Sequence, residues 1–182
     1  LSETMEIIRL GSCGSTNSFL REHAGEFPSL TLVTAREQTA GRGQRGNTWE
    51  SQPGKNLTVS MLWKPEGFAA RRQFAVSEAV SLAVADTLEE FGIEAKVKWP
   101  NDIYVGDRKI CGILIEHSVA GRNIESTVAG IGLNVNQREF LSDAPNPVSM
   151  LQSSGREHDL EAVLASLCRR LEERLQEVDG EG

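Results

Sequence analysis

The residues of this chain with the clearest chemical potential lie in the glycine- and arginine-rich segment "GRGQRGNT", residues 41–48. The segment nearly matches the P-loop pattern G-x-x-x-x-G-K-[ST], but Asn47 stands where the phosphate-binding lysine belongs. Pro53 and Gly54 follow soon after, so the helix that receives phosphates in a P-loop cannot begin here. The segment is therefore not a Walker A loop. A solvated surface loop, an RNA-binding glycine–arginine segment and a different anion-binding loop remain as alternatives.

Three other polar or glycine-bearing segments accompany this loop. They are "KWPND" at 98–102, "KICGILIE" at 109–116 and "GIGLNVN" at 130–136. Taken one at a time, they are typical of a turn, of a strand that starts with a solvated lysine, and of a strand with a glycine bulge. Together with the loop they interrupt one small sheet at four places, which core packing alone does not explain. Their combination favours a ligand-binding site.

The composition narrows the classes of protein to which the chain can belong. The formal net charge is −7, whereas a general nucleic-acid binder has a basic footprint. The three cysteines show no CxxC spacing and the three histidines no cluster, so a metal ion is expected only if it arrives with a substrate. No apolar run reaches the roughly 18 residues that a membrane span needs, and no signal peptide is recognised. The expected location is the cytoplasm, without nucleic-acid or membrane partners.

The hydrophobic pattern predicts the elements that must position these segments. Runs rich in β-branched residues predict strands over 5–10, 30–37, 57–63, 96–99, 102–105, 109–119 and 124–136. Helical periodicity and capping residues predict helices over 15–24, 69–91 and 159–178. This arrangement predicts an α+β fold, a mixed, largely antiparallel β-sheet with helices packed on one face.

Four blocks in this order and spacing resemble the catalytic domain of biotin–protein ligases. They are "STN" (15–17), "QTAGRGQRGNTW" (38–49), "KWPNDIYVGDRKICGILIE" (98–116) and "GIGLNVN" (130–136). Lipoate ligases and octanoyltransferases share the fold, but the GRG and KWPND blocks are specific to biotin ligases. The resemblance implies a class II synthetase-like catalytic domain over residues 1–182, of the monofunctional type, with no N-terminal helix-turn-helix and no evident C-terminal β-barrel. Without that barrel, which caps the family's nucleotide site, we expect an intact biotin pocket and weakened ATP binding.

The resemblance implies an ATP-dependent ligase (biotin–[acetyl-CoA-carboxylase] ligase). Biotin and Mg-ATP give biotinyl-5′-AMP, and the adenylate then acylates a lysine on the biotin-carrier domain of a carboxylase. Because the first step brings a carboxylate against a triphosphate, the site needs cations and backbone N–H groups placed around the developing charge. Arg42 and Lys109 are therefore the expected catalytic residues. A homodimer is an open alternative to a monomer.

The family's binding residues carry over by matching position. For biotin they are Ser15, Thr16, Asn17, Gln38, Gly41, Arg42, Lys109, Gly112, Gly130 and Gly132. For ATP and the adenylate they are Arg42, Arg45, Trp49, Lys98, Asn101, Asp102, Lys109 and Asn134, with Mg²⁺ arriving on the ATP. No side chain is expected to act as a covalent nucleophile, and Cys111 is expected in the core. The competing functions are a lipoate or octanoate ligase or transferase and a non-catalytic biotin- or nucleotide-binding module.

Two residues depart from the usual family loop. Gln44 stands where an arginine is common, and Asn47 stands near another position that is frequently basic. Because fewer cations then face the adenylate, we expect weaker retention of that intermediate. Gln44→Arg should slow the release of biotinyl-adenylate in a single-turnover experiment. Identical release rates for the two proteins would contradict this expectation.

Overall fold

The computed structural model describes residues 5–42, 51–99, 101–141 and 146–180. Its strands are β1 (Glu6–Cys13), β2 (Thr31–Gln38), β3 (Leu57–Trp63), β4 (Lys96–Lys98), β5 (Asp102–Val105), β6 (Arg108–Ala120) and β7 (Asn123–Leu133). Its helices are α1 (Thr16–Glu22), the 3₁₀ helix η2 (Ala70–Arg72), α2 (Gln73–Glu90), α3 (Met150–Ser154) and α4 (Leu160–Gly180). The predicted strands and helices are all confirmed, with small shifts at their ends.

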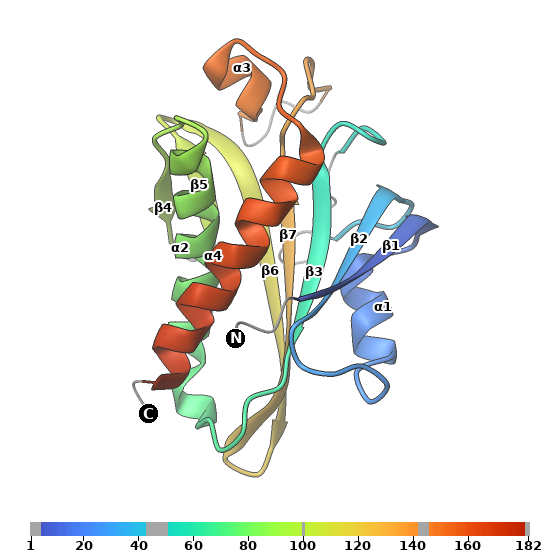
Figure 1. Ribbon diagram of the computed structural model, residues 1–182, viewed down its shortest axis with the longest axis vertical. Coiled ribbons are helices and arrows are strands. Elements are labelled where there is room, and N and C mark those ends of the chain that lie inside the picture. The colour runs from blue at the N-terminus through green and yellow to red at the C-terminus, as the bar shows by residue number, and fades with distance from the viewer. Residues whose placement is uncertain (1–4, 43–50, 100, 142–145, 181–182) are drawn as a thin grey trace.

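Within the described residues, seven strands form one sheet in the order β1-β2-β3-β7-β6-β5-β4 (Figure 1). β1 and β2 are parallel, and every other neighbouring pair is antiparallel. The parallel pair is possible because α1 supplies the crossover that two parallel strands require. The predicted mixed, largely antiparallel sheet is confirmed.

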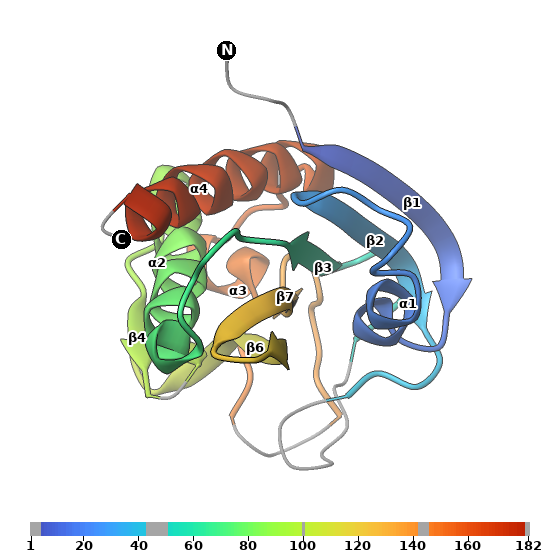
Figure 2. The ribbon, with the colours of Figure 1, turned by 90° about the horizontal axis from the view of Figure 1, so that it is seen from below.

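The two faces of the sheet are covered by different helices. Since successive side chains of a strand point to opposite faces, neighbours such as Leu32 and Val33 belong to separate clusters. Leu32 joins the main core with α2 and α4, whereas Val33 packs with Leu20 of α1. Figure 2 shows α1 and α4 on opposite sides of β2 and β3. The predicted packing of helices on one face therefore holds for the two long helices, and α1 covers part of the other face.

The short helix α3 was absent from the elements that the sequence predicts. Ser149 begins it with a capping box, in which the Ser149 side chain accepts from the Gln152 N–H and the Gln152 side chain accepts from the Ser149 N–H. Gly155 ends it in the left-handed conformation, with φ of 77°. The S-x-x-Q spacing is a signal that could have identified this helix.

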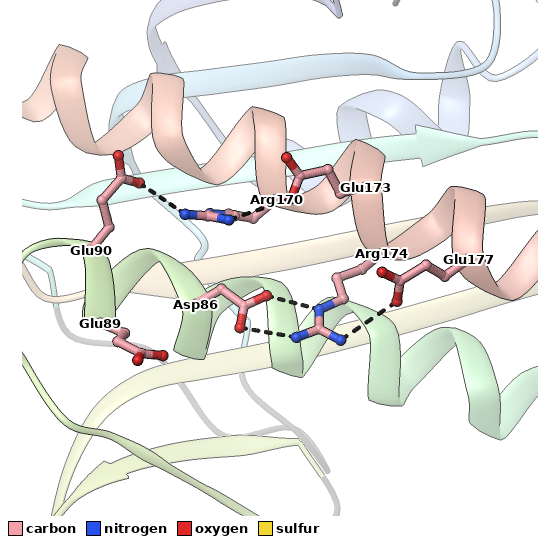
Figure 3. A pocket seen from close by; sticks show the side chains of 7 residues that line it. All are labelled: Asp86, Glu89, Glu90, Arg170, Glu173, Arg174 and Glu177. Atoms are coloured by element: carbon pink, nitrogen blue, oxygen red, sulfur yellow. Dashed lines mark hydrogen bonds and ion pairs between the residues drawn. The ribbon is translucent and has the colours of Figure 1, made fainter.

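The two long helices are held together by an apolar stripe and by ion pairs. The buried stripe of α4 consists of Val163, Leu164, Leu167, Leu171 and Leu175. Beside it, seven charged side chains of α2 and α4 line a pocket (Figure 3). In that pocket Arg174 donates to Asp86 through Nε at 2.8 Å and Nη2 at 3.0 Å. None of the helices in the described ranges is long and apolar enough to cross a membrane.

The bidentate pair between Arg174 and Asp86 should contribute measurably to stability. Both side chains are partly buried, so this pair is less screened by solvent than an exposed pair. We expect Asp86→Asn to lower the free energy of unfolding by about 1 kcal/mol. The matched control is Glu173→Gln, which removes an exposed pair to Arg170 at 3.4 Å and should cost less than about 0.5 kcal/mol. Urea denaturation of both variants measures the difference; equal values would contradict the expectation.

Candidate functional site

The candidate site begins where α1 meets the sheet. Ser15 is the N-cap of α1, and its Oγ accepts from the Ser18 N–H at 3.3 Å. Because this cap starts the helix directly after β1, the first two helical residues, Thr16 and Asn17, pack against the sheet. Thr16 is 2% exposed and Asn17 is 4% exposed, which is unusual for polar side chains and requires partners.

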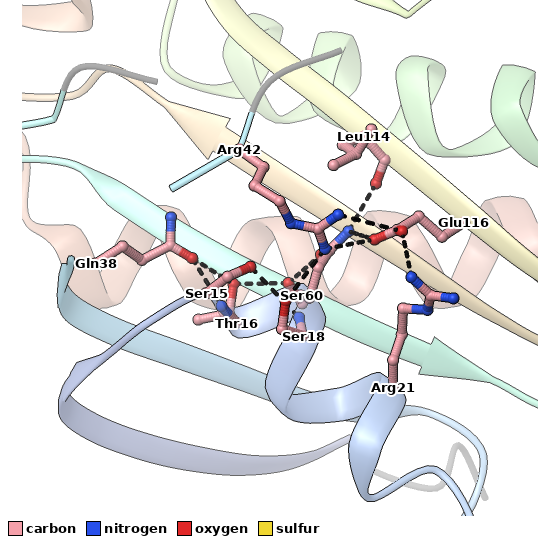
Figure 4. A network of polar contacts seen from close by, with 10 residues as sticks. Ser15, Thr16, Ser18, Arg21, Gln38, Arg42, Ser60, Leu114 and Glu116 are labelled. Atoms are coloured by element: carbon pink, nitrogen blue, oxygen red, sulfur yellow. Dashed lines mark hydrogen bonds and ion pairs between the residues drawn. The ribbon is translucent and has the colours of Figure 1, made fainter. Parts of the chain in front are cut away.

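A continuous hydrogen-bond chain supplies those partners (Figure 4). Gln38 Oε1 accepts from the Thr16 N–H at 2.7 Å, and Thr16 Oγ1 also lies 3.1 Å from it. Thr16 Oγ1 lies 2.7 Å from Ser60 Oγ, and Ser60 donates to Asn17 Oδ1 at 2.5 Å. Since Gln38 Oε1 faces Thr16, the Nε2 end of this amide points away from α1 (Figure 4). These hydrogen bonds fix which polar atoms of Thr16, Gln38 and Ser60 are left to bond a ligand.

Glycines on β7 and β6 leave room beside this chain. Gly130 lies opposite Ser60 on β3 and Leu114 on β6. A Cβ on Gly130 would lie 2.8 Å from Asn17 Cγ and closer still to Asn17 Oδ1. Glycine is therefore required at position 130 if the Asn17 side chain is to keep its observed place against β7.

The neighbouring row of the sheet on the same face holds two further glycines. Gly112 on β6 pairs with Gly132 on β7 on one side and with Asp102 on β5 on the other. Because the period of a strand is two, Gly112 and Gly132 face the same way as Leu114 and Gly130. We call these four residues, Gly112, Leu114, Gly130 and Gly132, the floor of the site; they lie between α1 and β5. The expected roles of Gly112, Gly130 and Gly132 as pocket walls remain predictions, but these residues do lie together.

Three donors converge on the carboxylate of Glu116 at one side of this floor. Arg42 Nη2 donates to Glu116 Oε1 at 2.9 Å, and Arg21 Nη1 donates to Oε2 at 2.7 Å. Asn17 Nδ2 donates to Oε1 at 3.1 Å and to the Leu114 carbonyl oxygen at 3.2 Å. Burial opposes ionisation, but the hydrogen bonds and positive charges of these partners outweigh it and lower the pKa of the Glu116 carboxyl. Glu116 therefore stays ionised at neutral pH.

Lys109 and Asp102 form an ion pair at the β5 end of the floor. Lys109 Nζ lies 3.0 Å from Asp102 Oδ1, and the two side chains are 15% and 23% exposed. A register shift between Ile103 and Tyr104 places Lys109 opposite Tyr104. Asp102 is the strand partner of Gly112, so this ion pair lies beside the glycine-bearing part of the sheet that borders α1. The structure thus brings the two expected catalytic cations, Arg42 and Lys109, to one face of the sheet.

Two asparagines expected at the nucleotide site have buried oxygens. Among the described residues, Asn101 Oδ1 and Asn134 Oδ1 are buried without a hydrogen-bond partner. Asn134 Nδ2 does have one, the carbonyl oxygen of Val148 at 3.1 Å. Unpaired buried acceptors carry a cost and are typical of sites that receive a donor or a cation.

Of the remaining expected site residues, some border the ion pair or Arg42 and others lie outside the described residues. Lys98 of the edge strand β4 is the strand partner of Asp102, and its Nζ lies 4.7 Å from the centroid of the Tyr104 ring. Gly41 directly precedes Arg42. Arg45 and Trp49, with Gln44 and Asn47, lie outside the described residues.

The sequence correctly predicted the burial of Cys111 but did not indicate three polar residues of the site. Cys111 is fully buried, burial raises the pKa of its thiol, and the prediction of a core residue is confirmed. Ser60, Arg21 and Glu116 were not assigned a role from the sequence. Glu116 ends the quoted block "KICGILIE", but nothing in its spacing shows which cations it contacts.

Within the described ranges, no group of three or more His, Cys, Asp or Glu side chains is placed to hold a metal ion.

Comparison with known proteins gives consistent results. A profile of the Biotin/lipoate A/B protein ligase family matches residues 12–136. The bifunctional ligase/repressor BirA of Escherichia coli is 35% identical over 170 residues, which are 92% of this chain and 53% of BirA. The biotin–[acetyl-CoA-carboxylase] ligase of Paracoccus denitrificans is 33% identical over 168 residues, 85% of this chain and 67% of that protein. The chain thus spans about half the length of BirA.

Solved structures agree with the sequence relatives. The biotin protein ligase from Aquifex aeolicus, in complex with biotin and ATP, has a TM-score of 0.85 and 31% identity to this chain. The alignment covers 97% of this chain and 73% of that one. The described sheet and helices therefore correspond to most of a ligase whose structure holds both ligands.

Proposed function

Since the chain belongs to the biotin/lipoate A/B protein ligase family, we propose that it is a biotin–protein ligase. It would activate biotin with ATP to biotinyl-5′-AMP and transfer the biotinyl group to a lysine on the biotin-carrier domain of a carboxylase. The observation that carries this proposal is the placement of Arg42 and the Lys109–Asp102 pair on one glycine-floored face, beside the hydrogen-bond chain of α1. All of these residues lie in the matched span 12–136.

The first step requires charge neutralisation, which this face can supply. A biotin carboxylate oxygen attacks the α-phosphorus of ATP, the bond to the bridging oxygen of the β-phosphate breaks, and pyrophosphate leaves. Arg42 would neutralise the carboxylate and Lys109 the α-phosphate, because preplaced cations lower the cost of charge that develops in the transition state. The partial shielding of these side chains from water, with Lys109 15% and Arg42 40% exposed, would strengthen both interactions.

The Mg²⁺ that accompanies ATP also fits the residues present. It prefers oxygen ligands and keeps several waters. The Asp102 carboxylate and the unpartnered oxygens of Asn101 and Asn134 are such ligands or acceptors for metal-bound water. The ion would neutralise the triphosphate. Asp102 would then have two partners, Lys109 and the hydrated ion.

The polar chain beside α1 favours biotin over an aliphatic acid. The ureido ring of biotin presents two N–H donors and a carbonyl acceptor, whereas lipoate and octanoate are apolar at that end. Thr16, Gln38 and Ser60 bond to one another, and a polar ring would match their remaining hydrogen-bonding capacity, which an apolar substrate would leave unused. A non-catalytic binding module would use the same contacts without turnover.

Several expectations from the sequence stay predictions. The elements from β1 to α4 would form one catalytic domain, and cytoplasmic location follows from the same proposal. A homodimer is a further prediction, which sedimentation would test.

The decisive experiment is a direct search for the acyl-adenylate. The purified chain would be incubated with Mg-ATP and, in separate reactions, with biotin, lipoate or octanoate, and the products identified by mass spectrometry. Formation of biotinyl-5′-AMP alone is the expected result. An adenylate only with lipoate or octanoate would move the chain to another branch of the family. Biotin binding without any adenylate would support a binding module instead.

A further inference from the structure

Glu116 of β6 is the point at which α1 and the chain that follows β2 are tied together. Asn17 comes from the first turn of α1, Arg21 from its last turn, and Arg42 from the chain that follows β2. All three donate hydrogen bonds to the two oxygens of one carboxylate, at 3.1, 2.7 and 2.9 Å respectively for their shortest contacts (Figure 4). Glu116 itself is only 18% exposed, so these bonds are partly shielded from solvent.

The carboxylate restrains an otherwise adaptable cation. The Arg42 side chain is 40% exposed, and a free arginine loses rotamer entropy when a ligand immobilises it. Here Arg42 contacts both Glu116 oxygens, at 2.9 and 3.4 Å, and Ser18 Oγ at 3.2 Å. Much of that cost is therefore met before any substrate arrives.

The charges of the cluster do not cancel. Two guanidinium groups share one carboxylate, which leaves one net positive charge at the end of the α1 hydrogen-bond chain. A simple one-to-one pair between Arg42 and Glu116 would have neutralised Arg42 instead. Arg21 thus allows Glu116 to hold Arg42 while the cluster stays attractive to an anion.

We propose that Glu116 is a positioning residue that holds the Arg42 guanidinium ready for the substrate carboxylate, and that Arg21 keeps this cluster cationic. The inference rests on the proposed function, in which Arg42 receives the carboxylate of biotin. Glu116 does not touch the reacting atoms and acts through Arg42. Its effect should therefore depend on the negative charge of the ligand.

The test compares a charged ligand with a neutral one. Calorimetry would measure binding of biotin and of biotin amide, which lacks the carboxylate, to wild type and to Glu116→Gln. The expected result is a loss of about tenfold in affinity for biotin and less than about twofold for the amide. Equal losses for both ligands would mean that Glu116 only supports the fold, and an unchanged or higher biotin affinity would mean that Arg42 needs no positioning. Either result overturns the inference.

Arg21→Gln tests the charge argument independently. It removes a half-exposed guanidinium and leaves Glu116 to neutralise Arg42 alone, so biotin binding should fall about threefold and amide binding should not change. The matched control is Glu161→Gln, which removes an exposed two-bond pair with Arg9, at 2.7 and 3.0 Å, and should alter neither ligand. If Glu116→Gln melts below the assay temperature, Arg21→Gln decides: no change in biotin affinity overturns the inference. Failure of the proposed function is distinct: a chain that does not take biotin would bind neither ligand as wild type, and a binding module would bind biotin without forming the adenylate.

Discussion

Replacing Lys109 by methionine should reduce adenylate formation by about 10²- to 10³-fold, the cost of removing one preplaced group that stabilises transition-state charge. The side chain is only 15% exposed and lies 3.0 Å from Asp102. The substitution therefore removes a cation and also exposes an unbalanced carboxylate to the incoming triphosphate and biotin. Both changes increase the repulsion between the biotin carboxylate and the triphosphate in the transition state, which explains the size of the expected effect.

Pyrophosphate exchange dependent on biotin measures this step without the carrier domain. The control is Lys96→Met, which removes an exposed lysine from the edge strand β4, opposite Tyr104, and should leave the exchange rate unchanged. A Lys109→Met protein with more than about a tenth of the wild-type rate would contradict a catalytic role for Lys109.

Gly130→Ala should lower biotin affinity by about 30- to 100-fold while the sheet still forms. A Cβ at this position meets the side-chain amide of Asn17, so Asn17 must leave its place. Its bonds to Ser60, Leu114 and Glu116 would then break or lengthen. If the site that binds biotin depends on these bonds, the loss of two or three of them, each worth about 1 kcal/mol, accounts for an effect of this size.

Gly11→Ala is the matched control, because Gly11 also lies on a strand but a Cβ there meets nothing within 4 Å. Calorimetric titration with biotin and a thermal melt would be run on both variants. Biotin affinity unchanged in a folded Gly130→Ala protein would show that Asn17 is not needed for binding. Gly11→Ala should match wild type in both measurements.

Local signals in the sequence were enough for most of the elements. The run "LTVSMLW" predicted β3 because β-branched and large apolar residues suit a buried strand, and all seven of its residues are buried. The strand does alternate apolar residues with Thr58 and Ser60, but both of its faces are buried, so the alternation alone does not show that α1 packs on the side of Ser60. α1 was therefore predicted as a helix but not placed on the second face of the sheet.

By itself, the sequence predicted that Arg42, Lys109 and the glycines around them belong to a site, because charged residues beside glycines in otherwise apolar strands are hard to explain by packing. Only the tertiary structure decided which partners those cations have. Ser60 looks like an ordinary strand residue until it lies between Thr16 and Asn17. Glu116 meets Arg42 across 74 residues of sequence. Such contacts depend on strand register and on the helix that covers the face, and spacing along the chain does not encode either.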